Sequence, residues 1–314
     1  MSDQPTRAGF AAVIGAPNAG KSTLVNRLVG SKVSIVTRKV QTTRFPVRGV
    51  AIEGQAQIVL VDTPGVFTPR RRLDRAMVRA AWAGAEDADA VVHLVDAEAE
   101  IASLAKDATP AQHRGVEDTR TITEQLKKAA RPSILALNKI DAVKRDQLLA
   151  IADALYKSGA YSEVFMVSAE NGSGVGDLKA RLGALMPEGH WLYPEDQTAA
   201  LPVRLLAAEI TREKVYLRVH EELPYAAAVE TTAFEERPDG SARIEQTIYV
   251  ERESQRPIVL GKGGQTLKWI GQKSREELTE ILGRTIHLFL HVKVVEDWQN
   301  KRDFYRDTGL DFDV

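Results

Sequence analysis

Cysteine is absent from the 314 residues of this chain, which excludes disulfide bonds and fits a protein of the reducing cytosol. No apolar run approaches the roughly 20 residues that a bilayer-spanning helix needs. The first residues also lack the basic head and apolar core of a signal peptide. Strong charge of one sign is missing as well, since the formal net charge is −1. Any nucleic-acid binding must therefore come from a local basic patch.

Clustered metal ligands are missing too. The six histidines are scattered along the chain. His287 and His291 share one face of a strand-like segment, but no third ligand accompanies them. A solvated surface explains this pair better than a metal site does.

The pattern of apolar residues divides the chain into two domains. Residues 1–186 alternate strand-like runs with helix-like stretches, which predicts a doubly wound α/β domain. Residues 187–202 are rich in turn formers and predict a linker to a second domain, residues 203–314. Residues 96–120 are polar and alanine-rich and predict a solvated insertion before a helix over 121–130. The expected strands begin near Phe10, Gly49, Gln57, Ala90, Ser133 and Glu163.

A glycine-rich segment lies between a strand-like run that ends at Ile14 and a helix-like run. Its glycines allow backbone N–H groups to close around phosphate oxygens, and the positive helix end adds attraction. Lys21 is expected to reach the β- and γ-phosphates, and Ser22 to ligate Mg²⁺. The predicted nucleotide-binding residues here are Gly15, Ala16, Pro17, Asn18, Ala19, Gly20, Lys21, Ser22 and Thr23.

A second polar motif, Asn138, Lys139, Ile140 and Asp141, selects the base. It follows an apolar run and should lie at the carboxyl end of a central parallel strand, where ligands bind in such sheets. The Asp141 carboxylate can accept two hydrogen bonds from guanine, and adenine lacks both donors. Required polar contacts of this kind discriminate by roughly 10⁴–10⁵-fold. Asn138 is expected to tie this motif to the phosphate-binding loop, and the Lys139 stem to cover the base.

Two further segments are expected to sense the γ-phosphate and its metal ion. Asp62 ends an apolar run and should lie near the hydration shell of Mg²⁺, while the Gly65 N–H can contact the γ-phosphate. In the polar stretch 41–44, either Thr42 or Thr43 should ligate Mg²⁺, and their spacing does not decide between them. The motif around Gly65 is Asp62, Thr63, Pro64 and Gly65, followed by Val66.

A fifth motif, Ser168, Ala169 and Glu170, follows another strand-like run and should place a backbone N–H on guanine O6. Five motifs in this order indicate a guanine-nucleotide switch. The candidate catalytic residues are Lys21, Thr42, Thr43 and Gly65.

The second domain has the predicted order α-β-β-α-α-β. A helix is expected over 204–217, paired strands over 226–235 and 241–250, and a last strand over 285–294. Between them, a loop and helix are expected over 259–267 and another helix over 273–282. This order resembles a type II KH domain, an α+β fold in which a G-x-x-G loop brings the backbone close to a nucleic-acid phosphate.

The expected RNA groove surrounds this glycine loop at residues 261–264. Residues 256–275 contain five basic residues and no acidic one, a local positive stripe suited to single-stranded RNA. Ile258, Leu260, Leu267 and Ile270 are expected beneath the bases, and Trp269 in the core. The candidate RNA-binding residues are Ile258, Leu260, Gly261, Lys262, Gly263, Gly264, Leu267, Lys268, Ile270, Lys273 and Arg275.

A P-loop GTPase domain followed by a type II KH domain resembles the Era family over nearly the whole chain. The matching residues are 15–22, 41–44, 62–65, 138–141, 168–170 and 261–264. The resemblance implies a GTPase that uses Mg²⁺, binds the 3′ end of small-subunit ribosomal RNA, and assists assembly of the small (30S) subunit. It also implies a cytoplasmic protein at the surface of the inner membrane, and we expect a monomer.

Two positions bear on how GTP is hydrolysed. Val66 stands where Ras-type switches have a glutamine that orients the attacking water, so hydrolysis must use backbone groups, ordered water, a cation or a partner. Asn18 resembles the asparagine that helps to hold K⁺ in related GTPases, which makes K⁺ a second candidate cofactor. A role in stabilising the turn explains Asn18 equally well. Unassisted turnover is expected at about 10⁻⁴–10⁻² s⁻¹.

Two other functions remain open from the sequence. The chain can be a GTPase whose client is a different RNA or a protein. It can also be an RNA-binding module whose nucleotide site is only structural, although Lys21, Ser22 and Asp62 argue against that reading.

Overall fold

The computed structural model describes residues 5–37, 39, 41–105, 108–195, 197–198, 201–219, 226–306 and 308–314. It divides into two compact units, residues 1–200 with 313–314 and residues 201–312. The linker expected at 187–202 lies partly outside the described residues, at 196 and 199–200. The domain boundaries drawn from the sequence remain a prediction.

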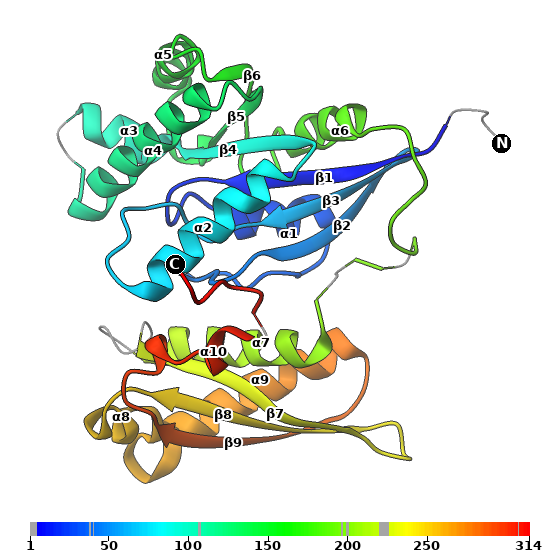
Figure 1. Ribbon diagram of the computed structural model, residues 1–314, viewed down its shortest axis with the longest axis vertical. Helices are drawn as coiled ribbons and strands as arrows, with labels where there is room; N and C mark the ends of the chain where they lie inside the picture. The colour runs from blue at the N-terminus through cyan, green and yellow to red at the C-terminus, as the bar shows by residue number, and fades with distance from the viewer. Residues whose placement is uncertain are drawn as a thin grey trace. The chain divides into compact units, whose positions relative to one another are not determined.

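The first unit is a six-stranded sheet with helices on both faces (Figure 1). The strand order is β2-β3-β1-β4-β5-β6, with β2 antiparallel to β3 and every other neighbouring pair parallel. This doubly wound α/β fold confirms the prediction. The strands are β1 (Arg7–Ile14), β2 (Val47–Glu53), β3 (Ala56–Asp62), β4 (Ala90–Asp96), β5 (Ser133–Asn138) and β6 (Tyr161–Met166).

Two apolar cores lie on opposite faces of this sheet. On β1, Ala11 and Val13 belong to one core, and Ala12 and Ile14 to the other. Because successive strand residues point to opposite faces and both faces are covered, these strands are continuous apolar runs in the sequence. One core includes α1 (Lys21–Val29) and α6 (Val175–Leu185), and the other includes α2 (Arg72–Glu86), α4 (Pro110–Lys128) and α5 (Arg145–Tyr156).

The prediction of a solvated insertion at residues 96–120 is wrong, because helices occupy most of this interval. α3 (Ala97–Leu104) follows β4 directly, and α4 begins at Pro110, well before the helix expected at 121–130. Thr109 and Gln112 form a capping box at the start of α4. The buried stripe of α4 includes two threonines, which weakened its apolar signal in the sequence. The stripe consists of Val116, Thr119, Ile122, Thr123 and Leu126.

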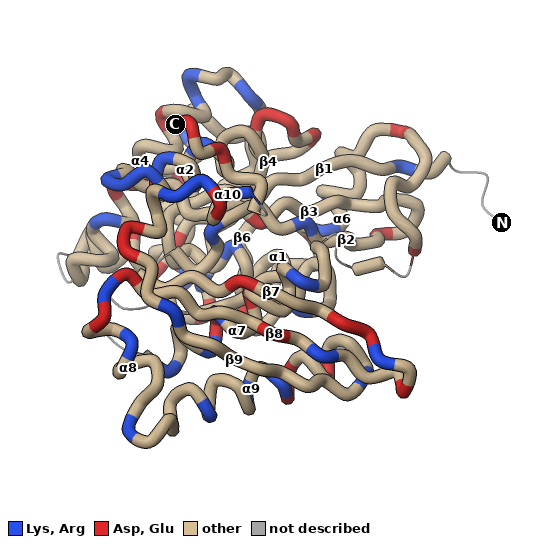
Figure 2. The backbone as a smooth tube through the Cα atoms, turned by 60° about the horizontal axis from the view of Figure 1, so that its bottom comes forward, with Lys and Arg blue, Asp and Glu red and all other residues tan. Residues whose placement is uncertain are grey.

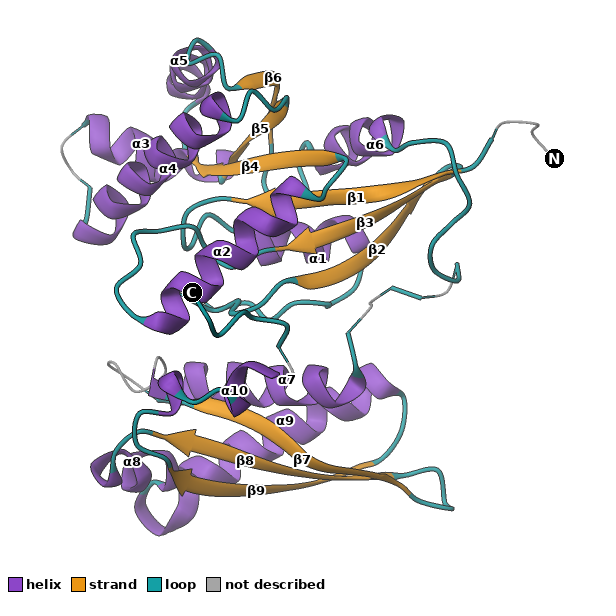
Figure 3. Cartoon of the chain, viewed as in Figure 1, coloured by secondary structure: helices purple, strands orange, loops and turns teal. Residues whose placement is uncertain are grey.

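The second unit is a three-stranded sheet in the order β7-β8-β9, with β7 and β8 antiparallel and β8 and β9 parallel (Figure 3). Its element order confirms the α-β-β-α-α-β prediction. The strands are β7 (Ala228–Glu236), β8 (Ala242–Val250) and β9 (Ile286–Val294). The helices are α7 (Val203–Arg218), α8 (Arg256–Leu260), α9 (Gln265–Leu282) and α10 (Asp303–Arg306).

The helix boundaries around the glycine loop need correction. α8 precedes the loop, and α9 runs from Gln265 to Leu282 without the interruption expected between 267 and 273. Gly271 lies inside α9. A Cβ there would lie 3.4 Å from Cδ1 of Leu290, so this glycine lets the helix pack closely on β9.

Among the described residues, no helix combines the length and apolar character that a membrane crossing demands.

Candidate functional site

The loop between β1 and α1 lies at the carboxyl end of the parallel strands, where open α/β sheets bind ligands. It closes on the buried Lys21, whose Nζ donates to the carbonyl oxygens of Gly15 (3.1 Å) and Ala16 (2.9 Å). Burial lowers the pKa of Lys21 to about 8, despite the attraction of Asp62. A bound phosphate would supply the counter-charge that this buried ammonium lacks.

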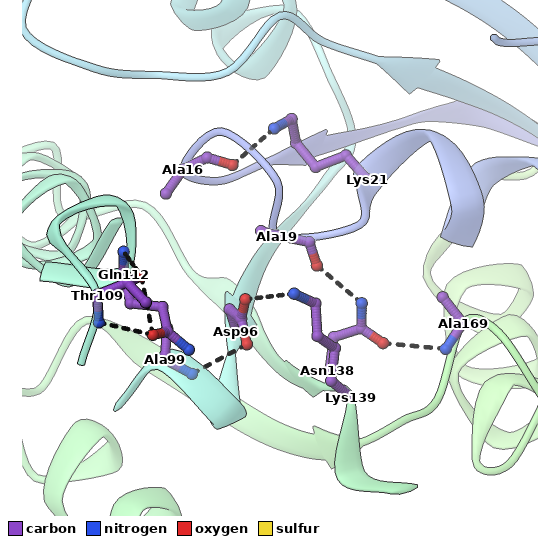
Figure 4. A network of polar contacts seen from close by, with 10 residues as sticks. All are labelled: Ala16, Ala19, Lys21, Asp96, Ala99, Thr109, Gln112, Asn138, Lys139 and Ala169. Carbon is purple, nitrogen blue, oxygen red and sulfur yellow. Dashed lines mark hydrogen bonds and ion pairs between the residues drawn. The ribbon is translucent and has the colours of Figure 1, made fainter. Parts of the chain in front are cut away.

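Asn138 joins the loops that surround this site (Figure 4). Its Nδ2 donates to the Ala19 carbonyl oxygen (2.7 Å), and its Oδ1 accepts the Ala169 N–H (2.9 Å). Gly20, with φ 97°, makes this approach possible, because a Cβ there would lie 2.4 Å from Asn138 Nδ2. The contact between Asn138 and the phosphate-binding loop that the sequence predicted is therefore present. Asn138 also accepts the hydrogen bond of the Ala169 N–H.

Ser22, Thr43 and Asp62 bring their side-chain oxygens together. Asp62 Oδ2 accepts from Ser22 Oγ (2.7 Å) and Thr43 Oγ1 (3.2 Å), and the two hydroxyl oxygens are 2.8 Å apart. Asp62 is fully buried, which raises its pKa despite these hydrogen bonds. Its Oδ1 has no hydrogen-bond partner within the described part of the chain. Hydroxyl and carboxylate oxygens are the ligands that Mg²⁺ prefers, so the cluster fits this ion.

The same geometry separates the two adjacent threonines. Thr42 Oγ1 donates to the Lys39 carbonyl oxygen (2.7 Å) and lies 2.6 Å from Thr37 Oγ1. It therefore closes a local turn, whereas the Thr43 hydroxyl joins Ser22 and Asp62.

The segment after β3 lies against the phosphate-binding loop. The Val66 N–H donates to the Gly15 carbonyl oxygen (3.1 Å), and the Val66 side chain is buried in the core. Thr63 Oγ1 donates to the Val13 carbonyl oxygen (2.8 Å), and a Cβ on Gly65 would lie 3.0 Å from Pro17. Gly65 is thus held against the phosphate-binding loop, and Val66 packs as an apolar core residue.

The base-binding side is organised around Lys139, whose backbone has φ 65°. Its Nζ pairs with Asp96 Oδ2 at 2.5 Å, and Asp96 Oδ1 accepts the Ala99 N–H (3.1 Å) at the start of α3 (Figure 4). The Ile140 N–H donates to the Val167 carbonyl oxygen (3.4 Å), and Asp141 is exposed. The carboxylate expected to read guanine is therefore accessible.

The 168–170 loop is supported from inside and from α1. Ser168 Oγ accepts the Asn171 N–H (3.2 Å). Arg27 donates from Nε to the Ala169 carbonyl oxygen (3.2 Å) and from Nη2 to the Glu170 carbonyl oxygen. Two remaining nucleotide-site residues take ordinary positions: Thr23 is half-buried on α1, and Asn18 is exposed with φ 64°, a left-handed conformation that asparagine tolerates.

In the second unit, the glycine loop between α8 and α9 has an open side. Gly263 (φ 60°) and Gly264 (φ 78°) adopt left-handed conformations, and no heavy atom lies within 4 Å of a Cβ built on either. The side chain of Lys262 is exposed. A phosphate can therefore approach the backbone and the ammonium together.

The apolar residues expected beneath the bases divide into two groups. Ile258 is 53% exposed, and Leu260 and Leu267 are half-buried. Ile270 has no exposed surface and packs in the core with Val259, so its side chain does not reach the surface on which a base would lie. Trp269 packs against the same core, as expected.

The basic residues of the stripe are all exposed, and blue segments mark them along α8 and α9 (Figure 2). They are Arg256, Lys262, Lys268, Lys273 and Arg275. Lys273 Nζ pairs with Glu276 at 2.7 Å, which reduces its share of the positive field.

Comparisons with known proteins agree with both parts of this arrangement. A family model described as 50S ribosome-binding GTPase matches residues 10–139, and a KH-domain model matches residues 222–299. The GTPase Era of Caulobacter vibrioides is 74% identical over 309 residues, 98% of each chain. The GTPase Era of Maricaulis maris is 62% identical over 314 residues, 100% of each chain.

This chain belongs to the Era family of GTPases. A variant of Aquifex aeolicus Era bound to GDP and AlF₄⁻ is similar, with a TM-score of 0.86 and 37% identity over 97% of this chain and 99% of that one. The same values hold for Era in complex with MgGDPNP and nucleotides 1506–1542 of 16S ribosomal RNA. The protein is therefore a GTPase with a C-terminal KH domain.

Three residues of this Era-family GTPase support the site without having been predicted. Asp96 ends an apolar run, as Asp62 and Asn138 do, so the same signal would have found it. Arg27 lies within a helix and has no such signal. Asp74 is buried: its Oδ1 accepts from Gln41 Nε2 (3.1 Å), and its Oδ2 accepts the backbone N–H groups of residues 70 and 71 (3.0 Å each).

Proposed function

We propose that this Era-family GTPase is a nucleotide-controlled switch that binds the 3′ end of small-subunit ribosomal RNA and assists assembly of that subunit. The observation that carries the proposal is the open glycine loop with an exposed Lys262, on the same chain as a GTPase domain. The similar Era bound to 16S ribosomal RNA nucleotides supports the choice of client.

In the proposed nucleotide site, each residue has a role that follows from its position. Lys21 neutralises the β- and γ-phosphates, and the Gly65 N–H binds the γ-phosphate. Ser22 and Thr43 would ligate Mg²⁺ directly, and Asp62 through water. When bound, this ion neutralises charge on the phosphates. Asp141 selects guanine, and Asn138 holds the loops in register.

Because Val66 is an apolar core residue, its side chain cannot orient the water that attacks the γ-phosphate. Backbone groups, a cation or a group that RNA binding brings into place must orient this water instead. We therefore expect slow turnover that RNA stimulates. The proposed part of Asn18 in binding K⁺ is tested by comparing turnover in K⁺ and Na⁺ buffers, and equal rates would contradict it.

The decisive experiment measures GTP turnover with and without RNA that ends in the small-subunit 3′ sequence. Stimulation by this RNA, but not by a scrambled one, is expected. Turnover that neither RNA changes would favour a different client, and no turnover under any condition would favour an RNA-binding module.

The groove is tested with Lys262→Ala, which should weaken RNA binding and lower the slope of log affinity against log salt by about 0.7, the value for one phosphate contact on a single strand. Lys128→Ala, an exposed lysine at the end of α4, is the matched control.

Peripheral association with the inner membrane and a monomeric state are predictions whose support is the family resemblance. Flotation with anionic vesicles and sedimentation test them.

A further inference from the structure

A run of arginines follows the segment that carries Gly65. Residues 70, 71 and 72 are all arginine, and Arg75 and Arg79 follow on α2. The side chains of Arg70, Arg71 and Arg75 are exposed.

Little negative charge balances Arg70 and Arg71. The one acidic residue between positions 70 and 79 is Asp74, and it is buried with both oxygens occupied by Gln41 and by backbone N–H groups. Within the described ranges, neither Arg70 nor Arg71 has a carboxylate within ion-pair distance of its guanidinium. Arg75 differs, because its Nε donates to an oxygen of the terminal residue Val314 at 3.4 Å and so already contacts a carboxylate.

The position of the charges is also unfavourable for the fold itself. They gather at the first turn of a 15-residue helix, where the backbone already presents its positive end. Cations there destabilise a helix, and anions stabilise it. A local rule broken without a gain in folding indicates a function, and an anionic partner would be attracted by both the guanidinium groups and the helix end.

The chemistry of this surface favours a polynucleotide over a lipid surface. All five basic residues are arginine, whose planar fork can bind a phosphate through two parallel hydrogen bonds. A helix that lies on a membrane needs an exposed apolar face as well. Between residues 65 and 86, all of which are described, no large apolar side chain is exposed.

We propose that Arg70 and Arg71 form a second phosphate-binding surface for RNA, here called the arginine surface, whose position depends on the bound nucleotide. The proposal rests on the proposed function for its choice of RNA as the client. The surface starts five positions after Gly65, the expected γ-phosphate sensor. Asp74 fixes the backbone of residues 70 and 71 and also binds Gln41, in the segment that precedes Thr43.

Through these contacts, the bound nucleotide controls the position of the arginine surface. When loss of the γ-phosphate releases the segments around Gly65 and Thr43, the arginines lose their fixed positions. RNA contact in the GTP-bound state then requires no change in the KH domain.

The test compares the full-length double variant R70Q/R71Q with K144Q/R145Q. The control removes two exposed charges at the start of α5, another helix of the same unit. Both backbone N–H groups bound by Asp74 remain in R70Q/R71Q. Affinities are measured by fluorescence anisotropy over a range of salt concentrations, with a non-hydrolysable GTP analogue or GDP. The probes are an RNA of about 8 nucleotides, long enough for the KH groove, and one of about 35 nucleotides.

With the GTP analogue, R70Q/R71Q should bind the long RNA about 3- to 30-fold more weakly than the wild type. The salt slope should fall by about 1.4, the value for two phosphate contacts on a single strand. Binding of the short RNA, and binding of either RNA by K144Q/R145Q, should be unchanged. With GDP, the difference on the long RNA should shrink.

Three results would overturn the arginine surface. The first is equal affinities of R70Q/R71Q and K144Q/R145Q for the long RNA, and the second is equal losses with GDP and the GTP analogue. The third is loss of binding to anionic vesicles with RNA binding intact, which would assign the surface to lipid. If Lys262→Ala still weakens RNA binding in any of these cases, the proposed function stands and only the arginine surface fails.

Discussion

Single side chains decide how firmly the base-binding segment is held. Lys139 is expected to cover the base, and its ammonium is oriented by Asp96, which also caps α3. The side chains of this pair are 34% and 19% exposed, so solvent screens their attraction only in part. We therefore expect Asp96 to act as a positioning residue for the nucleotide site.

Asp96→Asn keeps a cap for α3 and removes the charge opposite Lys139. Since a partly exposed ion pair contributes about 1 kcal/mol, affinity for GDP and GTP should fall about fivefold. Titration with a fluorescent nucleotide measures this loss. Asp153→Asn is the matched control, because it breaks a pair with Lys157 of the same 2.5 Å length on the exposed face of α5. Equal affinities of the two variants would contradict the positioning role.

The two adjacent threonines give a second prediction at this scale. Thr43→Val removes a hydroxyl from the cluster with Ser22 and Asp62 and should lower Mg²⁺-dependent GTP turnover by about 10- to 100-fold. Thr42→Val removes a hydroxyl that closes a local turn and should have a much smaller effect. Turnover at a series of Mg²⁺ concentrations distinguishes them, and a similar loss in both variants would count against Thr43 as the ligand.

Sequence reasoning located Asp62 and Asn138, polar residues that end apolar runs, but overlooked Asp96, which ends another. It did not separate Thr42 from Thr43, because an irregular segment has no periodicity that tells neighbours apart. It also did not find Arg27, whose contact with the 168–170 loop joins residues distant in the sequence.

For the helices and strands, prediction from the sequence succeeded where a single pattern of apolar residues dominates the segment. The strands of the first unit are buried on both faces and appear as apolar runs, so their positions were clear. The first part of α4 was missed because Thr119 and Thr123 occupy part of its buried stripe, and the continuous helix α9 was divided into two. Tertiary packing overrides local propensity in both helices.

α3 and α4 also create a pH-dependent element around Glu100. Burial raises the pKa of Glu100 to about 7 from its usual 4.5, despite the attraction of Arg120 and with a smaller contribution from Asp96. The native state then binds the proton more tightly than the unfolded state does. Stability should therefore fall as pH rises from about 4.5 to about 7 and then level off.

Glu100→Gln removes this loss, so it should raise the unfolding temperature at pH 8 by a few degrees, on the order of 1–4 °C, and change it little at pH 5. Glu98→Gln, an exposed position on the same helix, should have little effect at either pH. Thermal unfolding at the two pH values measures the difference. A shift of the same size at both would show that Glu100 acts through packing and not through its charge.

For the whole molecule, the sequence predicted two units because the apolar pattern changes after residue 186, and each unit has its own core. It contained no information on how strongly the nucleotide and RNA sites influence each other. Coupling depends on differences in affinity between nucleotide states, and no single residue records such a difference.

Linkage nevertheless makes a quantitative prediction for the intact protein. The factor by which a GTP analogue tightens RNA binding relative to GDP must equal the factor by which RNA tightens binding of the analogue relative to GDP. We expect a factor of about 5–150, the usual range for coupled sites. Calorimetric titrations of RNA and nucleotide, each in the presence and absence of the other, measure both sides of this equality.

Two variants separate the sources of the coupling. Lys262→Ala should weaken RNA binding in both nucleotide states and leave the factor unchanged. The reason is that its loop joins α8 and α9 of the second unit and contains none of the residues expected to bind the nucleotide. R70Q/R71Q should reduce the factor toward one, because its arginines follow the γ-phosphate sensor. A wild-type factor of one would mean that the nucleotide does not control RNA affinity, and the protein would then be a GTPase and an RNA binder without being a switch.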